Sequence, residues 1–144
     1  MKQTTWNVLA ERAQAAVRDA QQMVSEARHR VDKLEASIVH LDHLRDDYIM
    51  RYNETQKVAH SISDTITYRK FLEHLRGLRR KVESQLQDAN LQLADAKAAQ
   101  MTAVREKAKM DAMVERDERN RALAAAKLEQ RALDEVGLRS FNLR

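Results

Sequence analysis

The sequence predicts an all-α fold in which two long helices form an antiparallel coiled-coil hairpin, the second helix being longer and overhanging the first. Three observations support this prediction. The 144 residues include no proline and only two glycines, Gly77 and Gly137, so residues that interrupt helices are nearly absent. Small or apolar residues recur at spacings of three and four along two stretches of the chain, which is the heptad pattern of a coiled coil. A polar segment separates the two stretches.

The composition argues against a large globular core and against several classes of site. Charged residues make up 33% of the chain, and much of the hydrophobic 43% is alanine, which favours helix but buries little area. The absence of cysteine excludes disulfides, thiolate metal sites and thiol catalysis, and it agrees with a reducing compartment. The net charge of +4 arises from 26 basic residues interleaved with 22 acidic ones, unlike the one-sided basic surface of a typical nucleic-acid binder.

Two further absences concern membranes and targeting. Residues 2–11 lack the hydrophobic region of a signal peptide, and no apolar run is longer than that at 122–126. We therefore expect a cytoplasmic protein that does not insert into a membrane.

The first helix is predicted over residues 3–55. Its apolar seam begins with Trp6, Leu9, Ala13, Ala16, Ala20, Met23 and Ala27. One extra four-residue step then leads to Val31, Leu34, Ile38, Leu41, Tyr48 and Tyr52, with Arg45 between the last leucine and the first tyrosine. That extra step predicts a stutter, which unwinds a coiled coil locally without ending it.

A turn is predicted at residues 56–66, where the apolar period is lost. This region and the residue after it offer several candidate N-caps for a new helix, namely Ser61, Ser63, Asp64, Thr65 and Thr67. The second helix is then expected over residues 67–136, followed by a short tail at 137–144, so that residues 1–144 form a single coiled-coil domain.

The seam of the second helix has an apolar part and a polar part. The apolar part runs through Phe71, Leu75, Leu78, Val82, Leu86, Ala89, Leu93 and Ala96, with a second stutter between Leu78 and Leu86. The pattern continues through Lys107, Met110, Val114, Asp117, Arg121, Ala124 and Leu128, and Gly137 is the expected C-terminal stop. Because charged residues stand at core-like positions there, self-pairing of the overhang should be weak.

Charge supports the folding back of the chain. Residues 69–81 hold six basic side chains against the single acid Glu73, whereas residues 42–54 hold four acids against Arg45 and Arg51. A hairpin places these two segments side by side. The basic cluster can therefore be neutralised by the first helix, or it can meet phosphates or an acidic partner.

No pattern of an enzyme, metal or cofactor site is present. His40 and His43 share a helix face, but no acid completes a recognised zinc motif, so solvated histidines are expected. The chain has no glycine-rich phosphate loop and no nucleophile elbow. A two-helix coil also lacks a concavity that could desolvate paired carboxylates such as Asp46 and Asp47. We expect no enzymatic activity, no metal and no cofactor.

Aromatic residues gather near the predicted turn. Four of the six in the chain are Tyr48, Tyr52, Tyr68 and Phe71. Large side chains at one end of an alanine-rich coil suggest a partner-binding hot spot. The alternative is that these rings fill a wide section of the coil beside the turn, and a mixture of the two is also compatible with the pattern.

The stretch from Leu41 to Val82 resembles the flagellar export protein family FliJ. The resemblance rests on Tyr48 and Tyr52, a polar turn, and then Tyr68, Phe71, Leu72 and Leu75. It implies a non-enzymatic, stalk-like component of the flagellar type III export apparatus, cytoplasmic and peripherally associated with the inner-membrane face. Two alternatives are the stalk protein of a virulence-type secretion system and a general adaptor that binds nucleic acid or a membrane surface.

The resemblance also implies partners and contact residues. The open end of the hairpin would enter the pore of the hexameric export ATPase FliI, and the turn end would dock on the export gate protein FlhA. Export chaperones and the ATPase regulator FliH are further partners that it suggests, whereas nucleic acid is not expected. The implied gate-binding residues are Leu41, Tyr48, Tyr52, Phe71, Leu75 and Leu78, and the implied ATPase-binding residues are Trp6, Leu9, Arg116, Asp117, Arg121 and Leu128.

Overall fold

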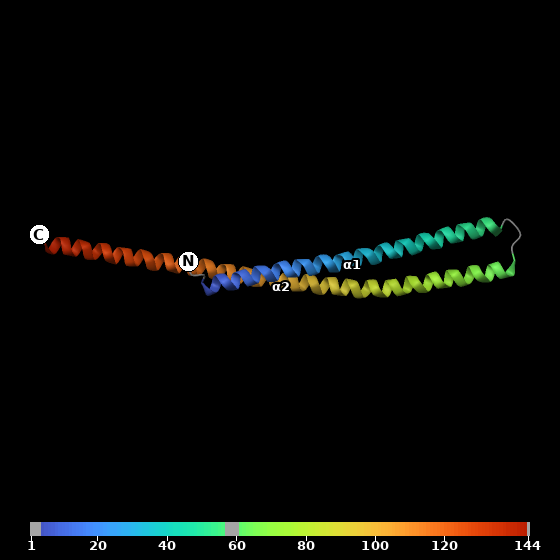
Figure 1. Cartoon of the computed structure of the whole chain (residues 1–144), viewed down its shortest axis with the longest axis horizontal. Helices are drawn as coiled ribbons and strands as arrows, with labels where there is room; N and C mark the ends of the chain where they lie inside the picture. Colours follow the sequence, from blue (N-terminus) through green and yellow to red (C-terminus); the bar gives the residue numbers. More distant parts are fainter. Residues whose placement is uncertain (1–3, 57–60, 144) are drawn as a thin grey trace. The chain divides into compact units, whose positions relative to one another are not determined.

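Two long helices make up the computed structural model, which describes residues 4–56 and 61–143 (Figure 1). Helix α1 spans Thr5–Gln56 and helix α2 spans Ile62–Asn142, with 52 and 81 residues. The predicted all-α fold with a longer second helix is therefore confirmed. Contacts divide the chain into a hairpin unit, Ala20–Ala99, and a terminal unit, Met1–Asp19 with Gln100–Arg144. Each unit is described by itself below, and the expectation of a single domain stays a prediction.

Helix α2 begins earlier than the sequence predicted because Ser61 caps it. The Asp64 backbone N–H donates to Ser61 Oγ at 3.3 Å, and the Ser61 backbone N–H donates to Asp64 Oδ2 at 3.4 Å. This reciprocal capping box satisfies two of the backbone donors that a helix start leaves free. The expected start at residue 67 is thus corrected to Ile62. Residues 57–60 of the predicted turn lie outside the described part of the chain.

The α1 side of the hairpin unit forms an uninterrupted heptad seam. Its most covered residues are Ala20, Val24, Ala27, Val31, Leu34, Ile38, Leu41, Arg45, Tyr48 and Tyr52, which alternate in steps of three and four. The predicted seam residue Met23 is instead 63% exposed, and Val24 takes its place. The predicted stutter before Val31 is therefore wrong. It arose from choosing Met23 over its neighbour, since both are apolar.

The α2 side of the hairpin unit is regular as well. Its seam runs through Tyr68, Leu72, Leu75, Arg79, Val82, Leu86, Ala89, Leu93 and Ala96, again in steps of three and four. Phe71 and Leu78, both predicted in the seam, are 37% and 38% exposed. The predicted stutter between Leu78 and Leu86 is also wrong. The position that keeps the period is the charged Arg79, which a search for apolar residues passes over.

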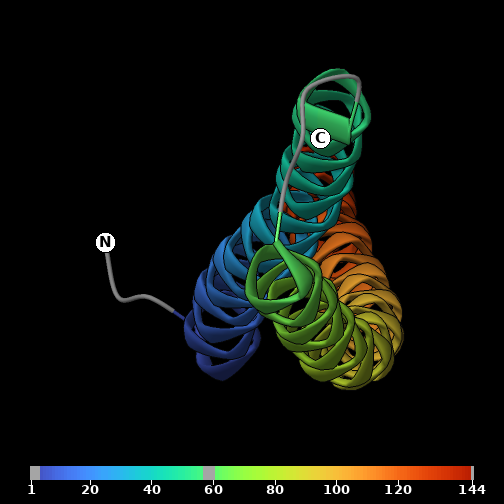
Figure 2. The ribbon, with the colours of Figure 1, turned by 90° about the vertical axis from the view of Figure 1, so that its right-hand side faces the viewer.

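Contacts between the helices of the hairpin unit show that they are antiparallel. Tyr52 lies against Tyr68, Asp42 binds Arg79, and Arg30 donates to Gln92, so positions fall along α1 as they rise along α2. Figure 2 looks along the helices from the end where α1 stops and α2 starts. The hairpin predicted from the two seams is thus present in this unit.

The terminal unit pairs the start of α1 with the middle of α2 through smaller and more polar side chains. Ala13 and Val17 are buried on α1, whereas the predicted seam residue Ala16 is exposed. Half-buried residues of α2 in this unit are Gln100, Ala103, Lys107, Met110, Val114 and Asp117. The expected polar seam is therefore present at Lys107 and Asp117, while Arg121 lies outside it as an exposed residue.

The last part of α2 has no covering helix among the described residues. Every residue from 118 to 143 is exposed. Gly137 does not end the helix, which continues to Asn142, and no described glycine adopts the positive φ of a left-handed C-cap. The predicted stop at Gly137 is therefore corrected, and residues 137–142 of the predicted tail belong to the helix, because a helical glycine costs only about 1 kcal/mol.

No helix in the described part of the chain is both long enough and apolar enough to cross a membrane.

Candidate functional site

An aromatic cluster joins the two helices near the turn end of the hairpin unit. The rings of Tyr52 and Tyr68 stack at a centroid distance of 3.6 Å with an interplanar angle of 9°. Tyr48 stacks on Tyr68 at 5.3 Å and lies at 4.2 Å from Phe71 in a tilted arrangement. The three tyrosines are half-buried. They fill the seam, as one alternative predicted, while Phe71 also offers part of its ring to solvent.

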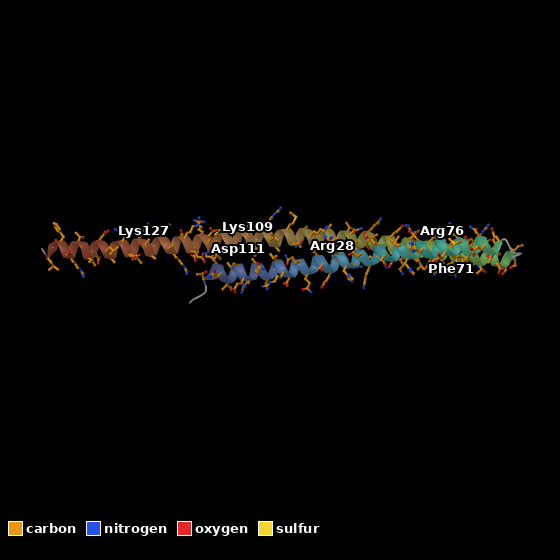
Figure 3. All side chains as sticks on the ribbon, turned by 90° about the horizontal axis from the view of Figure 1, so that it is seen from above. Arg28, Phe71, Arg76, Lys109, Asp111 and Lys127 are labelled. Atoms are coloured by element: carbon orange, nitrogen blue, oxygen red, sulfur yellow. The ribbon has the colours of Figure 1, made fainter. Side chains whose placement is uncertain are left out.

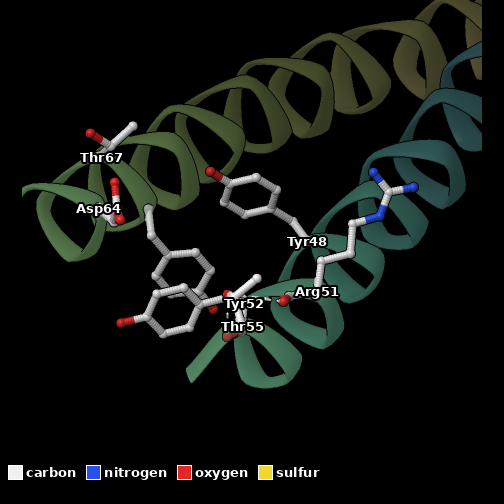
Figure 4. Close-up of a pocket in the computed structure, with 7 residues that line it drawn as sticks. Tyr48, Arg51, Tyr52, Thr55, Asp64 and Thr67 are labelled. Carbon is white, nitrogen blue, oxygen red and sulfur yellow. Dashed lines mark hydrogen bonds between the residues drawn. The ribbon is translucent and has the colours of Figure 1, made fainter. Parts of the chain in front are cut away.

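A shallow cavity of about 320 Å³ lies beside these rings (Figure 4). Its lining residues are Tyr48, Arg51, Tyr52, Thr55, Asp64, Thr67 and Tyr68. The hydroxyl groups of Tyr52 and Thr65 are 3.2 Å apart and form a hydrogen bond, which ties the phenol to the first turns of α2. Because the rings are held by one another and by this bond, the cavity walls are fixed on both helices.

One flank of the hairpin unit carries exposed apolar residues. Leu44, Phe71 and Leu78 each directly precede a seam residue and are 37–39% exposed. Arg30 and Gln92 also directly precede seam residues, and Arg30 donates a hydrogen bond to Gln92 at 2.7 Å. Residues that directly precede a seam residue on α1 therefore lie on the same side of the seam as those that do so on α2.

A second cavity, of about 440 Å³, lies along the same flank. It is lined by Ala36, Ser37, His40, Leu41, Leu78 and Val82. We call Leu41, Leu44, Phe71 and Leu78 the apolar flank. It combines a groove with exposed large side chains, which is the usual character of a protein-binding surface.

The opposite side of the seam carries an ion-pair network centred on Arg79. Its guanidinium donates to Asp42 at 2.8 Å and also pairs with Glu83. Arg45, the other seam arginine, lies 3.6 Å from Asp42 and 3.1 Å from Asp46. The hydrogen bond from Arg79 lowers the pKa of Asp42, and the same bond raises the pKa of Arg79. Sequence reasoning missed this network, although the heptad position of Arg79 was a sign of it.

The neutralisation expected for the basic segment is limited to Arg79. The five other cations of residues 69–81 are exposed, and none forms an ion pair with another described residue: Arg69, Lys70, Arg76, Arg80 and Lys81. The acidic helix therefore leaves a strongly basic surface at this end of α2.

The residues predicted to bind the export gate all fall in the hairpin unit. Leu41, Tyr48 and Tyr52 are half-buried, and Phe71 and Leu78 are exposed on the apolar flank. Leu75 is only 6% exposed, because it occupies the seam. Its side chain is therefore packed between the two helices and is not part of the accessible surface of the flank.

The residues predicted to bind the ATPase all fall in the terminal unit. Trp6, Arg116 and Leu128 are exposed, and Leu9 is half-buried. Asp117 and Arg121 form an ion pair at 3.3 Å along α2. A groove of about 370 Å³ between the helices of this unit is lined by Asn7, Ala10, Glu11, Gln14, Asp111 and Val114.

The histidines do not assemble a metal site in the part of the chain that the structure covers. His40 and His43 are exposed on α1. Within residues 4–56 and 61–143, no group of three or more histidine, aspartate or glutamate side chains is placed to hold a metal ion.

Comparison with known protein families gives a match. The family model described as Flagellar FliJ protein matches residues 2–144, which is essentially the whole chain. No curated protein and no solved structure matches the sequence.

Proposed function

Because the chain belongs to the flagellar FliJ family, a group of stalk-like, non-enzymatic components of type III export, we propose that it couples the export ATPase FliI to the export gate FlhA. In this role it binds the ATPase ring, promotes ring assembly and ATP hydrolysis, and holds the gate through the hairpin unit. The observation that supports the proposal is the presence of two chemically different exposed surfaces, the apolar flank in one unit and an uncovered helix in the other. The family match favours the flagellar apparatus over a virulence-type system.

The ATPase contact is assigned to the terminal unit. From residue 118 to residue 143, α2 has every side chain exposed and no helix beside it in the described structure. A single helix is narrow enough to enter the pore of a ring, at about 10–12 Å across with its side chains. Leu128 and Arg121 on this segment, with Trp6, Leu9, Arg116 and Asp117 in the adjoining paired region, are the proposed contacts.

The gate contact is assigned to the apolar flank. Phe71 and Leu78 project from α2 beside a groove whose α1 wall includes Leu41. Tyr48 contacts Phe71 and fixes its position. Tyr52 and Leu75 act through packing, since one is stacked on Tyr68 and the other is buried in the seam.

Further partners follow from the same location. A protein held between the ATPase and the gate would lie at the inner-membrane face, where FliH and the export chaperones also act. The exposed part of α2, residues 118–143, leaves surface free for these further partners.

The ATPase contact is tested by measuring ATP hydrolysis by FliI with the full chain and with a truncation that ends at Glu118. The truncation keeps the paired part of the terminal unit, which reaches Asp117. We expect the full chain to stimulate hydrolysis and the truncated chain to lose most of that effect. Equal stimulation by both, with both chains helical, would contradict the assignment to the uncovered segment.

The gate contact is tested with the double substitution Phe71→Ala and Leu78→Ala. Removing two central apolar contacts should weaken FlhA binding about 30-fold or more, as for hot-spot residues. Leu91→Ala is the matched control, because Leu91 is an exposed leucine of α2 outside the flank.

Leu75→Ala separates packing from contact in the same binding assay. It should lower the melting temperature with little effect on binding, because it removes a buried leucine, whereas Phe71→Ala should lower binding more than melting, because that ring is partly exposed. Unchanged FlhA binding by the double variant would reject the gate assignment.

A further inference from the structure

The start of α2 carries a surface of isoleucines and arginines that belongs to neither the proposed ATPase contact nor the proposed gate contact. Ile62, Ile66, Arg69, Arg76 and Arg80 are spaced so that they share one face of the helix. We call these five residues the tip stripe. Figure 3 labels Arg76 of the stripe and Phe71 of the apolar flank in the same part of α2. Arg76 lies three residues before the seam residue Arg79 and four after the seam residue Leu72, so the stripe runs beside the seam.

The stripe and the apolar flank lie on opposite sides of the seam. Phe71 and Leu78 directly precede the seam residues Leu72 and Arg79. Arg69 and Arg76 directly follow the seam residues Tyr68 and Leu75. Glu83, which pairs with Arg79, likewise directly follows the seam residue Val82, so the stripe lies on the same side of the seam as the ion-pair network. The two surfaces can therefore bind different partners at the same time.

The cations of the stripe are not neutralised within the described structure. Arg69, Arg76 and Arg80 are exposed and form no ion pair with another described residue. Lys70 adds a fourth exposed cation next to them, and Glu73 is the only acid in the segment 69–81. Arg79, one position from Arg80, is in contrast bound by Asp42 and Glu83. The local field at the stripe is thus strongly positive.

The apolar end of the stripe is open to solvent. Ile62 is 82% exposed and Ile66 is 50% exposed, although both lie in the first turns of α2. Two exposed isoleucines followed by a row of arginines supply the apolar and basic side chains that hold helices at a membrane interface, here along one helix face and not on two opposite faces. Isoleucine gains free energy on leaving water, and arginine gains it near lipid phosphates.

We propose that the start of α2 binds the surface of a bilayer containing anionic lipids. Ile62 and Ile66 lie against the boundary between headgroups and acyl chains, and Arg69, Arg76 and Arg80 contact the lipid phosphates. This is surface binding through one helix face, and it needs no segment that spans the bilayer. The proposal does not depend on the binding of FlhA, because the apolar flank lies on the other side of the seam.

A lipid surface fits the stripe better than nucleic acid does. Proteins that bind single strands stack bases on free aromatic rings, whereas Tyr48, Tyr52 and Tyr68 stack on one another. A phosphate backbone would also leave Ile62 and Ile66 in water. A bilayer, with an anionic surface above an apolar layer, uses both halves of the stripe.

The first experiment measures binding of the full chain to vesicles by flotation. We expect binding to vesicles of phosphatidylglycerol mixed with phosphatidylcholine, and little binding to vesicles of phosphatidylcholine alone. Binding should weaken as salt is raised, because the contacts between exposed charges are screened. Equal binding to both kinds of vesicle, or to neither, would overturn the proposal.

The second experiment uses two matched triple variants with equal net charge. Replacing Arg69, Arg76 and Arg80 by glutamine should weaken binding on the order of 100-fold, at about fivefold for each cation. The control replaces Arg12, Arg18 and Arg28 of α1, also exposed and without an ion pair in the described structure, by glutamine. The control should change binding only a few-fold. Equal losses in the two variants would mean a response to net charge alone and would overturn the proposal.

The third experiment tests the apolar half. Ile62→Ser with Ile66→Ser leaves the charge unchanged and should weaken vesicle binding about 10-fold or more, because two isoleucines lose their transfer from water. Circular dichroism checks that each variant is still helical. No effect of this double variant, together with displacement of the protein from vesicles by duplex DNA, would assign the arginines to nucleic acid and overturn the proposal.

Discussion

At the scale of single residues, the unusual feature is a pair of arginines in the seam of the hairpin unit. Arg45 and Arg79 occupy heptad positions that coiled coils normally fill with apolar side chains, and Asp42 lies within ion-pair distance of both. The side chains of Asp42 and Arg79 are 28% and 38% exposed, so water screens their attraction. Polar groups at core positions commonly fix register at a cost in stability. We infer that the network fixes how α1 aligns with α2.

The lowered pKa of Asp42 gives a pH-dependent contribution to stability. The carboxylate is favoured in the folded chain, mainly by the hydrogen bond from Arg79. Its contribution is therefore fully present above the unfolded value, near 3.8, and is lost as pH falls through the lower folded pKa. In Arg79→Met the contribution should be smaller, because its largest cause is removed, so the melting temperature of the variant should fall less on acidification than that of the parent chain.

Thermal melting followed by circular dichroism between neutral pH and pH 3 measures this difference. Arg80→Met is the matched control, because Arg80 is exposed and has no ion pair in the described structure. It should keep the acid dependence of the parent chain. The same acid dependence in Arg79→Met and the parent chain would contradict the assignment to Asp42.

Gly137 provides a second test at this scale. It lies inside α2, its φ is negative, and a Cβ built on it meets no atom within 4 Å. Gly137→Ala should therefore stabilise the local helix by up to about 1 kcal/mol. The measurement is slower amide hydrogen exchange of the flanking residues. Faster exchange would indicate that Gly137 caps the helix, as the sequence suggested.

At the scale of elements, the register of α1 decides which face is buried. Val24 is half-buried in the seam, whereas Met23 is 63% exposed. Val24→Ser should lower the free energy of unfolding by about 1–2 kcal/mol, because it places a hydroxyl in the seam and removes apolar area. Met23→Ser should change it by less than about 0.5 kcal/mol.

Urea unfolding of the two serine variants measures these free energies. Methionine favours helix more than valine does, so helix propensity alone would penalise Met23→Ser more, and a larger loss in Val24→Ser therefore reports burial. A larger loss of unfolding free energy in Met23→Ser than in Val24→Ser would show that Met23 is the buried residue, as the register with a stutter predicted.

At the scale of the whole molecule, three regions differ in how much side-chain contact holds them. The hairpin unit is packed by leucines and stacked tyrosines, the paired part of the terminal unit by alanines and polar residues, and residues 118–143 by no described helix. Local opening requires less free energy where tertiary contacts are fewer. Helices without a packing partner are also only marginally stable in water.

Amide hydrogen exchange should therefore follow the same order. We expect the fastest exchange at 118–143, intermediate rates in the paired part of the terminal unit, and the slowest exchange near Leu75 and Ala89, both buried in the hairpin unit. Addition of FliI should slow exchange at 118–143 if the proposed ATPase contact holds. Slow exchange at 118–143 in the isolated chain would contradict the description of this segment as uncovered, and a concentration series would show whether a second copy covers it.

The sequence by itself determined the fold class, the two helices and the family. Apolar residues repeat at spacings of three and four over two long stretches, which is the period of a helix in a coiled coil. No proline interrupts either stretch. The aromatic and leucine pattern around the turn carried the family resemblance, which the family match over residues 2–144 confirms. These properties follow from local spacing and composition, so they need no knowledge of what each helix packs against.

Only the tertiary structure decided the register and therefore the surfaces. Met23 and Val24, or Leu78 and Arg79, are neighbours that fit the spacing equally well once a stutter is allowed, and packing against the other helix selects one of each pair. The same selection buries Leu75, leaves Phe71 exposed, and pairs Arg79 with Asp42 while Arg76 and Arg80 stay unpaired. A step of one residue turns a side chain by about 100° around the helix, so contacts across the seam alone determine which residues a partner can reach.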